Sequence, residues 1–144
     1  MAITKHDAVV AAIVNVLLAS PALAGGVIDD ETNFDELPPS VNEAIRVTLL
    51  DSLPSKTYGQ VTWTSTVRIA CGARNDKAGA EGRVSSRLGA AVYARLMADQ
   101  TLGGLAEGID QPRMQPDLSL LGTRVGVLNL DFPVRHITAG RVLT

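Results

Sequence analysis

The chain has few aromatic residues and a single cysteine. Phe, Trp and Tyr together make up 3% of its 144 residues, so a core must be built from Val, Leu, Ile and Ala. Cys71 has no second cysteine to pair with, which excludes a disulfide within this chain. Two histidines and one cysteine are too few for a standard structural zinc site with four Cys or His ligands.

The chain also lacks an excess of positive charge. It carries 13 Lys and Arg against 15 Asp and Glu, a formal net charge of −2, which is not the footprint of a nucleic-acid-binding protein. Apolar residues at 46% and charged residues at 19% indicate a globular chain. A length of 144 residues fits one domain, so we predict a single domain over residues 1–144.

Catalytic motifs are missing as well. No serine lies in a nucleophile-elbow motif, and the glycine pairs 25–26 and 103–104 form neither a P-loop nor G-x-G-x-x-G. Cys71 ends the apolar face of a predicted strand, which is typical of a buried small hydrophobe. His136 is expected to be a side chain near a strand end rather than a ligand. We therefore predict that the protein is not an enzyme and that it binds no cofactor and no metal.

The first 24 residues have two interpretations. Lys5, the apolar run 8–18 and the small residues 22–24 fit a signal peptide that is cleaved on export. Against that interpretation, Asp7 offsets the charge of Lys5, and Asn15 interrupts the apolar run.

A helix that stays in the fold explains the same residues better. Thr4 followed by Asp7 resembles a capping box, and Pro21 with Gly25-Gly26 stops the helix at its other end. The apolar run is also shorter than the roughly 20 residues that a membrane span needs. We therefore predict a helix over about 4–19 that belongs to the mature protein.

Three segments alternate apolar and polar residues with period two, at about 43–51, 60–71 and 124–137. The strongest is 60–71, "QVTWTSTVRIAC", in which threonines share one face. The stretch 52–60 contains Pro and Gly and predicts a long hairpin connection. Pro133 lacks an N–H, which predicts that the last strand lies at a sheet edge or is bulged there.

The remaining segments complete an α+β layout. Leucines and valines at i, i+4 spacing predict a helix over about 78–100. The acidic stretch 29–41 reads as a surface loop, in which the paired acids are expected to be solvated rather than to bind a cation. Residues 105–116 are compatible with a short strand broken by prolines, and 139–144 with a mobile terminus. We predict an antiparallel sheet of about four strands with two helices packed on one face.

The other face of this sheet is expected to be polar. This face would be either solvated or in contact with a partner. It would carry mainly threonines and arginines: Arg46, Thr48, Thr62, Thr64, Thr66, Arg68 and Asn129.

This layout resembles the tail terminator, or tail completion, family of long-tailed bacteriophages. The shared features are an early helix, an acidic loop leading to a strand, a strand of the form "TWTSTVRIAC", an amphipathic helix after it, and a last strand near the end of the chain. The resemblance is one of layout and length, and it covers most of the chain.

The resemblance implies a structural role in the virion at the junction of tail and neck, after assembly in the host cytoplasm. Family members form a ring, typically a hexamer, that caps the tail tube, stops its growth and contacts head-completion or connector proteins. DNA would pass only in transit through the ring lumen, and no membrane is involved. From the positions of loops, we expect an assembly interface at Pro54, Lys56, Tyr58, Arg74, Asp76 and Lys77.

Three alternatives remain open from the sequence. The first is a small exported periplasmic or surface protein that loses residues 1–24 as a cleaved signal peptide. The second is another phage neck protein, and the third is a small α+β binding domain or enzyme whose site the sequence does not reveal.

Overall fold

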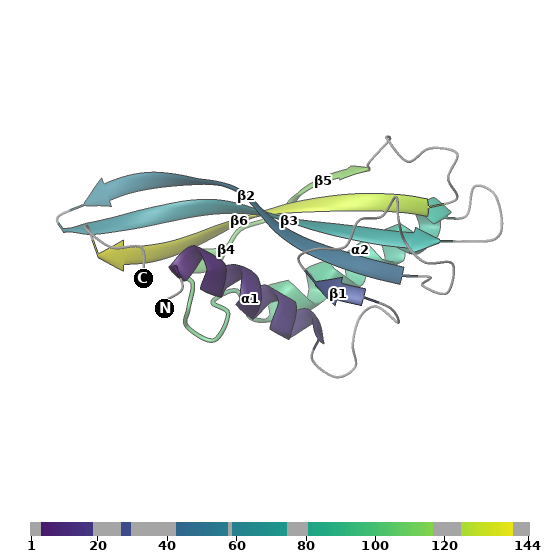
Figure 1. Cartoon of the computed structure of the whole chain (residues 1–144), viewed down its shortest axis with the longest axis horizontal. Helices are drawn as coiled ribbons and strands as arrows, with labels where there is room; N and C mark the ends of the chain where they lie inside the picture. Colours follow the sequence, from purple (N-terminus) through teal and green to yellow (C-terminus); the bar gives the residue numbers. More distant parts are fainter. Residues whose placement is uncertain are drawn as a thin grey trace.

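The protein consists of a long twisted sheet with two helices packed on one of its faces (Figure 1). The computed structural model describes residues 4–18, 27–29, 43–57, 59–74, 81–116 and 125–139. The elements in chain order are α1 (Lys5–Leu18), β1 (Val27–Asp29), β2 (Glu43–Thr57), β3 (Gln60–Arg74), α2 (Glu81–Ala98), β4 (Gly108–Ile109), β5 (Arg113–Pro116) and β6 (Val125–Ala139). This is the predicted α+β architecture, with six strands rather than about four.

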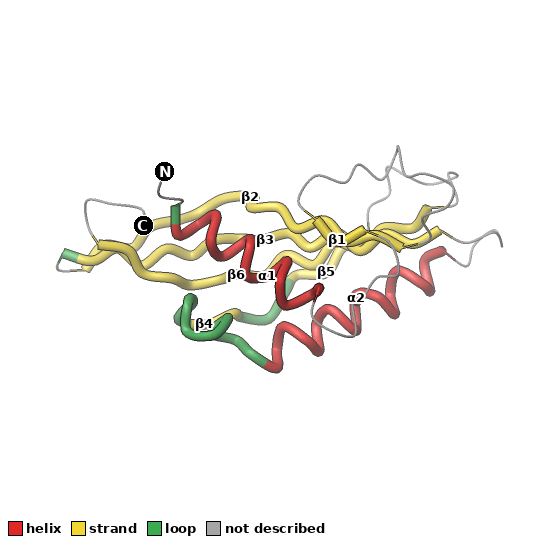
Figure 2. Tube along the Cα trace, turned by 60° about the horizontal axis from the view of Figure 1, so that its bottom comes forward, coloured by secondary structure: helices red, strands yellow, loops and turns green. Residues whose placement is uncertain are grey.

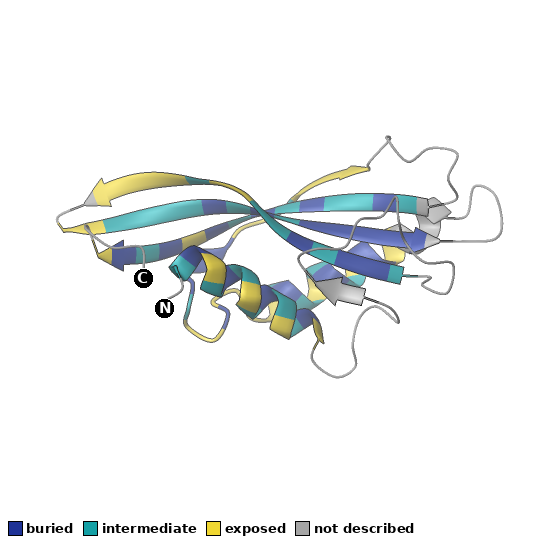
Figure 3. Cartoon of the chain, in the orientation of Figure 1, coloured by how far each residue is buried: buried dark blue, intermediate teal, exposed yellow. Residues whose placement is uncertain are grey.

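Three long antiparallel strands form the centre of the sheet. The strand order is β1-β2-β3-β6-β4, and β5 also pairs with β6. Strands β2, β3 and β6 have 15 residues each, or about 50 Å at roughly 3.3 Å per residue. Helix α1 has 14 residues and is therefore only about 21 Å long. The hairpin of β2 and β3 consequently extends past the helices, and the last residues of β2 are exposed (Figure 3).

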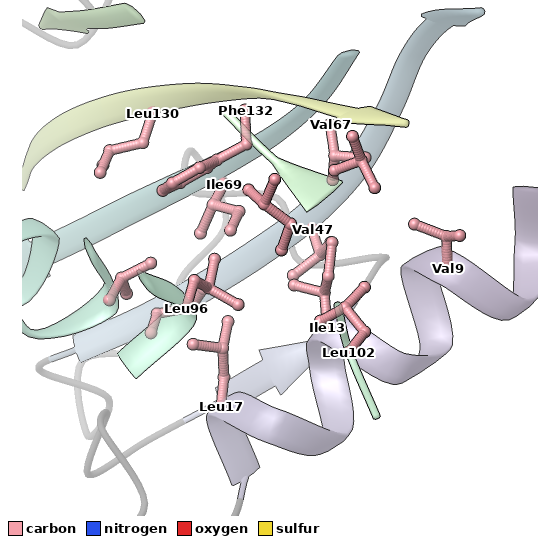
Figure 4. Packing of buried hydrophobic residues seen from close by; sticks show 14 of the residues in the cluster. Val9, Ile13, Leu17, Val47, Val67, Ile69, Leu96, Leu102, Leu130 and Phe132 are labelled. Atoms are coloured by element: carbon pink, nitrogen blue, oxygen red, sulfur yellow. The ribbon is translucent and has the colours of Figure 1, made fainter. Parts of the chain in front are cut away.

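The core lies between the helices and the central strands (Figure 4). Helix α1 contributes Val9, Ile13 and Leu17, which are fully buried and follow the i, i+4 spacing of one helix face. Helix α2 contributes buried residues at the same spacing: Leu88, Val92 and Leu96. The sheet contributes mainly β-branched and leucine side chains, together with Phe132: Ile45, Val47, Val67, Ile69, Leu130 and Val134.

Both helices lie on this face, at an angle to one another, and they meet near their C-terminal ends (Figure 2). Arg95 of α2 donates hydrogen bonds to the backbone oxygens of Val16 and Leu17 at 3.4 and 3.5 Å. These carbonyls belong to the last turn of α1, where a cation is favoured by the helix dipole. Helix α1 is thus a structural element of the core, as the capping pattern predicts.

The predicted hairpin connection at 52–60 is wrong, because β2 continues to Thr57. A bulge between Leu49 and Asp51 shifts the pairing with β3, so that Leu49 pairs with Val67 but Asp51 pairs with Thr66. The shift moves inward-facing positions from odd to even numbers, and Ser52 then pairs with the buried Ser65. A period-two pattern cannot be followed across such a change of parity.

The prediction that Pro133 places its strand at an edge or in a bulge holds in part: β6 is not an edge strand, but its pairing shifts by one residue between Ile109↔Val134 and Arg113↔Asp131. Strand β6 is interior, and its register with β3 runs without a shift. The Pro133 carbonyl accepts a hydrogen bond from the Asp110 N–H at 2.9 Å, so its backbone polar groups face away from β3. On the side of β6 away from β3, the neighbouring chain is interrupted between β4 and β5. Proline therefore causes no loss of a ladder hydrogen bond at this position.

The chain between α2 and β5 turns tightly. The Asp99 carboxylate accepts hydrogen bonds from Thr101 and from the Gly103 N–H, and these bonds lower the pKa of Asp99. Leu102 adopts a φ of 52° and is buried in the core. The predicted strand in 105–116 is present as β4 and β5, broken around Pro112.

Some predicted boundaries lie at the limits of the described residues. In the predicted loop 29–41 only Asp29 is described, as the last residue of β1, and in the terminus 139–144 only Ala139, as the last residue of β6. The described part of the predicted helix 78–100 begins at Glu81 and is helical to Ala98. That 1–144 forms a single domain stays a prediction.

Candidate functional site: assembly surfaces and a buried histidine cluster

The tip of the β2–β3 hairpin presents two of the predicted interface residues. Pro54 and Lys56 are exposed on β2, opposite Trp63 and Val61 of β3. Strand β1 pairs with β2 only at Ala44–Arg46, so this part of β2 has an open edge among the described residues. A bulge, a proline and a lysine on an open edge are features that hinder the addition of another strand. The hairpin end therefore suits contacts through side chains better than through its backbone.

The remaining predicted interface residues are not brought to the same place. Arg74 is the last residue of β3 and pairs with Val125, at the end of the sheet opposite to the hairpin turn. Along β3 this end lies about 40 Å from the residues that pair with Lys56, at roughly 3.3 Å per residue. Tyr58, Asp76 and Lys77 lie outside the described residues. The predicted set thus divides into two surfaces at the two ends of the hairpin.

A shallow apolar groove lies between α2 and β5, and the sequence did not reveal it. Its volume is about 440 Å³, and its lining combines Gly89 and Tyr93 of α2 with Met114 of β5 and the chain just before that strand. The Tyr93 hydroxyl donates a hydrogen bond to the Gln111 side-chain oxygen at 2.6 Å across one end. Met114 is 56% exposed, which is unusual for a large apolar side chain. A groove between one helix and one strand cannot be found from periodicity, because its walls come from separate segments.

The face of the sheet away from the helices is polar, as predicted. Its threonines and arginines are partly exposed rather than buried. Arg68 of β3 and Asp131 of β6 form a two-pronged ion pair there, with distances of 2.9 and 3.1 Å between guanidinium nitrogens and carboxylate oxygens. A second pair joins Arg135 and Asp110 at 3.4 Å and is more exposed.

A buried polar cluster joins α1 to β2, β3 and β6. His136 is fully buried, its Nε2 lies 2.9 Å from Ser65 Oγ, and Ser65 Oγ lies 2.7 Å from Ser52 Oγ. The ring of His6 meets the ring of His136 edge to face, with 4.6 Å between centroids. Trp63 also contacts His6, with 4.9 Å between centroids. No local sequence pattern indicates this cluster, because its members are separated by up to 130 positions.

The Ser65–His136 pair does not form a hydrolytic site. Both side chains are fully buried, so a substrate has no access to the hydroxyl. Among the residues that the structure describes, the buried His136 Nδ1 has no hydrogen-bond partner, whereas a catalytic histidine needs a group there that holds the ring in place. Burial, with His6 and Lys5 nearby, lowers the pKa of His136 to about 4, so the ring is neutral at pH 7.

Cys71 is a buried core residue, which confirms its interpretation as a small hydrophobe. Burial raises the pKa of its thiol to about 12, so the reactive thiolate is scarce at neutral pH. Within the described ranges, no three His, Cys, Asp or Glu side chains come together as metal ligands would. None of the helices in those ranges has the length and apolar character required to span a membrane.

The fold is similar to that of a chain in a solved virus-like particle. That chain belongs to the "Virion of native gene transfer agent (GTA) particle", and the two superpose with a TM-score of 0.68 at 14% sequence identity. The match covers 89% of this chain and 93% of the other. No family model and no curated protein matches the sequence. At this identity the likeness is one of fold, and it extends over nearly the whole of both chains.

Proposed function

We propose that this protein is a structural component of a phage-like virion. The observation that carries the proposal is the fold likeness to a virion chain over nearly the full length of both proteins. The sequence resemblance to tail terminator proteins is independent of that comparison and points to the same class of particle.

Within the virion, we propose the role of tail terminator. A ring of copies would cap the tail tube, stop its polymerisation and join it to the head-completion proteins. An elongated subunit suits this role, because its two ends can meet different partners. The exposed hairpin end around Pro54 and Lys56 would meet one partner, and the opposite end of the hairpin, where Arg74 pairs with Val125, would meet the other.

The proposed role is not catalytic. The one close Ser–His pair of the described residues is sealed in the core, and the Cys71 thiol is buried. The packing of α1 argues against export with loss of residues 1–24. That cleavage would remove Val9, Ile13 and Leu17, which are fully buried against the sheet and α2.

Inactivation of the gene in the producing cell tests the proposal. Electron microscopy of the resulting lysate should show heads without tails together with tail tubes of abnormal length, and expression of the protein in trans should restore complete particles. Normal particles in normal numbers would contradict any essential role in the virion. Particles that have tails of normal length joined to heads, but that lack a different component, would contradict the terminator role and leave a structural role in the virion.

A further inference from the structure

The first turn of α1 is joined to the sheet by polar contacts. Thr4 Oγ1 accepts a hydrogen bond from the Asp7 N–H at 3.1 Å and so caps the helix. Lys5 Nζ donates to the backbone oxygen of Ile137 at 2.8 Å. His6 places its ring between Trp63 of β3 and His136 of β6. The rest of the helix is fixed mainly by apolar packing, beginning at Val9, with the hydrogen bonds of Arg95 at its last turn.

The contact between the two imidazole rings is disfavoured when His136 is protonated, and more so when both rings are. Neutral His136 shares one hydrogen bond with Ser65 through Nε2, while Nδ1 has no partner among the described residues. A protonated His136 would carry an N–H on both nitrogens, and the N–H at Nδ1 would be buried without an acceptor. A second proton on His6 would put two positive rings 4.6 Å apart in a largely dry site.

The charges around the cluster do not favour protonation of both rings. On α1, Asp7 raises the pKa of His6, but burial outweighs it and the pKa of His6 is lowered overall. Lys5 lies on the same turn and lowers the pKa of His136. The facing groups of the sheet are neutral: Ser52 of β2, Trp63 and Ser65 of β3, and Thr138 of β6, which accepts a hydrogen bond from Trp63 Nε1 at 2.9 Å.

We propose that the contact between His6 and His136 is an acid-sensitive latch that holds the first turn of α1 on the sheet at neutral pH and releases it when the rings are protonated. Release lets His6 reach water, where its charge is solvated, and it opens a path for water to His136. Helix α1 stays attached beyond this turn, because Val9, Ile13 and Leu17 carry no titrating group. The latch does not depend on the proposed role in the virion.

Trp63 is the only tryptophan of the chain and lies against His6, so its fluorescence reports on the latch. A titration from pH 7.5 to pH 3.5 should follow Trp63 fluorescence and far-UV circular dichroism on the same sample. We expect a reversible fluorescence change with a midpoint below pH 6.5, at pH values where the circular dichroism signal is still that of the native protein. A fluorescence signal that stays constant until the helical signal is lost would overturn the proposal.

Two variants give the matched comparison. His6→Phe keeps an aromatic ring against Trp63 and removes the titrating group. The fluorescence change at pH values above those of acid unfolding should therefore disappear. Asp7→Asn leaves both rings in place and removes the nearby acid, so the midpoint should move to lower pH. An unchanged titration in folded His6→Phe would overturn the proposal.

Hydrogen exchange of the unaltered protein gives a readout that does not rely on variants folding. After correction for the intrinsic effect of pH on exchange, the amides of residues 8–10, which are bonded to the first turn, should lose protection at least tenfold between pH 7 and pH 4.5. The amides of residues 13–17 should change much less. An equal loss along the whole helix would mean global opening and would contradict a local latch.

Discussion

Gly89 of α2 faces Leu128 of β6 so closely that a Cβ on Gly89 would lie 2.8 Å from Leu128 Cδ2. Leu130 Cδ1 would be 3.3 Å away on the same side. In the sequence, Gly89 looks like a weak point of the helix, because glycine costs about 1 kcal/mol relative to alanine in a helix interior. The structure explains the glycine, since a residue without a side chain lets α2 approach β6 this closely without displacing Leu128.

Substitution of Gly89 by valine should destabilise the protein. The extra carbons must displace Leu128 and Leu130, and overpacking of this kind costs about 1–3 kcal/mol. Gly89→Ala should be close to neutral, because the tip of Leu128 can shift and the gain in helix propensity offsets the strain. Urea denaturation measures both free energies of unfolding. Ala90→Val, at an exposed position of the same helix, is the control, and equal stability of Gly89→Val and Ala90→Val would contradict the close approach.

The stability of the protein should fall on acidification from about pH 6.5 to about pH 4. In the folded state the pKa of His136 is lowered to about 4 by burial, while in the unfolded chain the pKa returns to the ordinary histidine value of 6.5. The unfolded state therefore binds more protons in this window, and each unit of pKa difference is worth about 1.4 kcal/mol, or about 3 kcal/mol in all. Above pH 6.5 this contribution is constant.

Urea denaturation of wild type and His136→Leu between pH 7 and pH 4 measures this effect. Carboxylates titrate in both proteins, so the informative quantity is the difference between the two slopes of stability against pH. The variant should lose less stability than wild type as the pH falls. Parallel slopes would show that His136 does not titrate differently in the two states.

The Arg68–Asp131 pair should contribute measurably to stability, unlike the pair of Arg135 and Asp110. The first is two-pronged and its Asp131 side chain is only 13% exposed, whereas both side chains of the second are about half exposed. Double-mutant cycles with alanine should give a coupling energy of about 1 kcal/mol for the first pair and less than about 0.5 kcal/mol for the second. Raising the salt concentration should weaken the first coupling only slightly. Equal couplings would contradict the geometric difference.

Removal of residues 1–24 should prevent native folding. The deletion takes away Val9, Ile13 and Leu17, and full burial of each such side chain is worth about 1.5–3 kcal/mol. Their sum is comparable to the whole stability of a typical domain, which is about 5–15 kcal/mol. The truncated chain should be insoluble or lack a cooperative unfolding transition. A soluble truncated protein that unfolds cooperatively would revive the interpretation of these residues as an export signal.

The sequence predicted those elements in which one pattern runs without interruption. The alternation in β3 and the i, i+4 spacing of Leu88, Val92 and Leu96 each describe a single buried face, and both elements were found where expected. The end of β2 was missed because a bulge changes the parity of its buried positions. The interior position of the strand that holds Pro133 could not be predicted from the residues around it. It depends on the gap between β4 and β5, which is a property of the neighbouring strands.

The candidate surfaces were predicted less well than the fold, for a related reason. Loop positions along the chain do not show that Pro54 and Arg74 lie at opposite ends of one hairpin. The histidine cluster depends on the register between β3 and β6 and on the docking of α1, which no local pattern encodes.

Variants at the two ends of the hairpin should impair assembly in different ways. We expect Pro54→Ser with Lys56→Glu to affect one junction of the ring, and Arg74→Glu with Lys77→Glu to affect the other. Complementation of the inactivated gene, followed by electron microscopy, would separate a failure to cap tubes from a failure to join heads. Ala94→Glu on the exposed side of α2 is the control for added charge. Full infectivity or transfer activity with both double variants would remove these residues from the interface.

The most direct test of the proposed function is the location of the protein in finished particles. Particles carrying the protein with a short epitope tag can be purified, labelled with gold-conjugated antibody and imaged by electron microscopy. The proposed role predicts label at one position in each particle, at the end of the tail that meets the head. Label along the tail, or particles that contain no tagged protein, would contradict it.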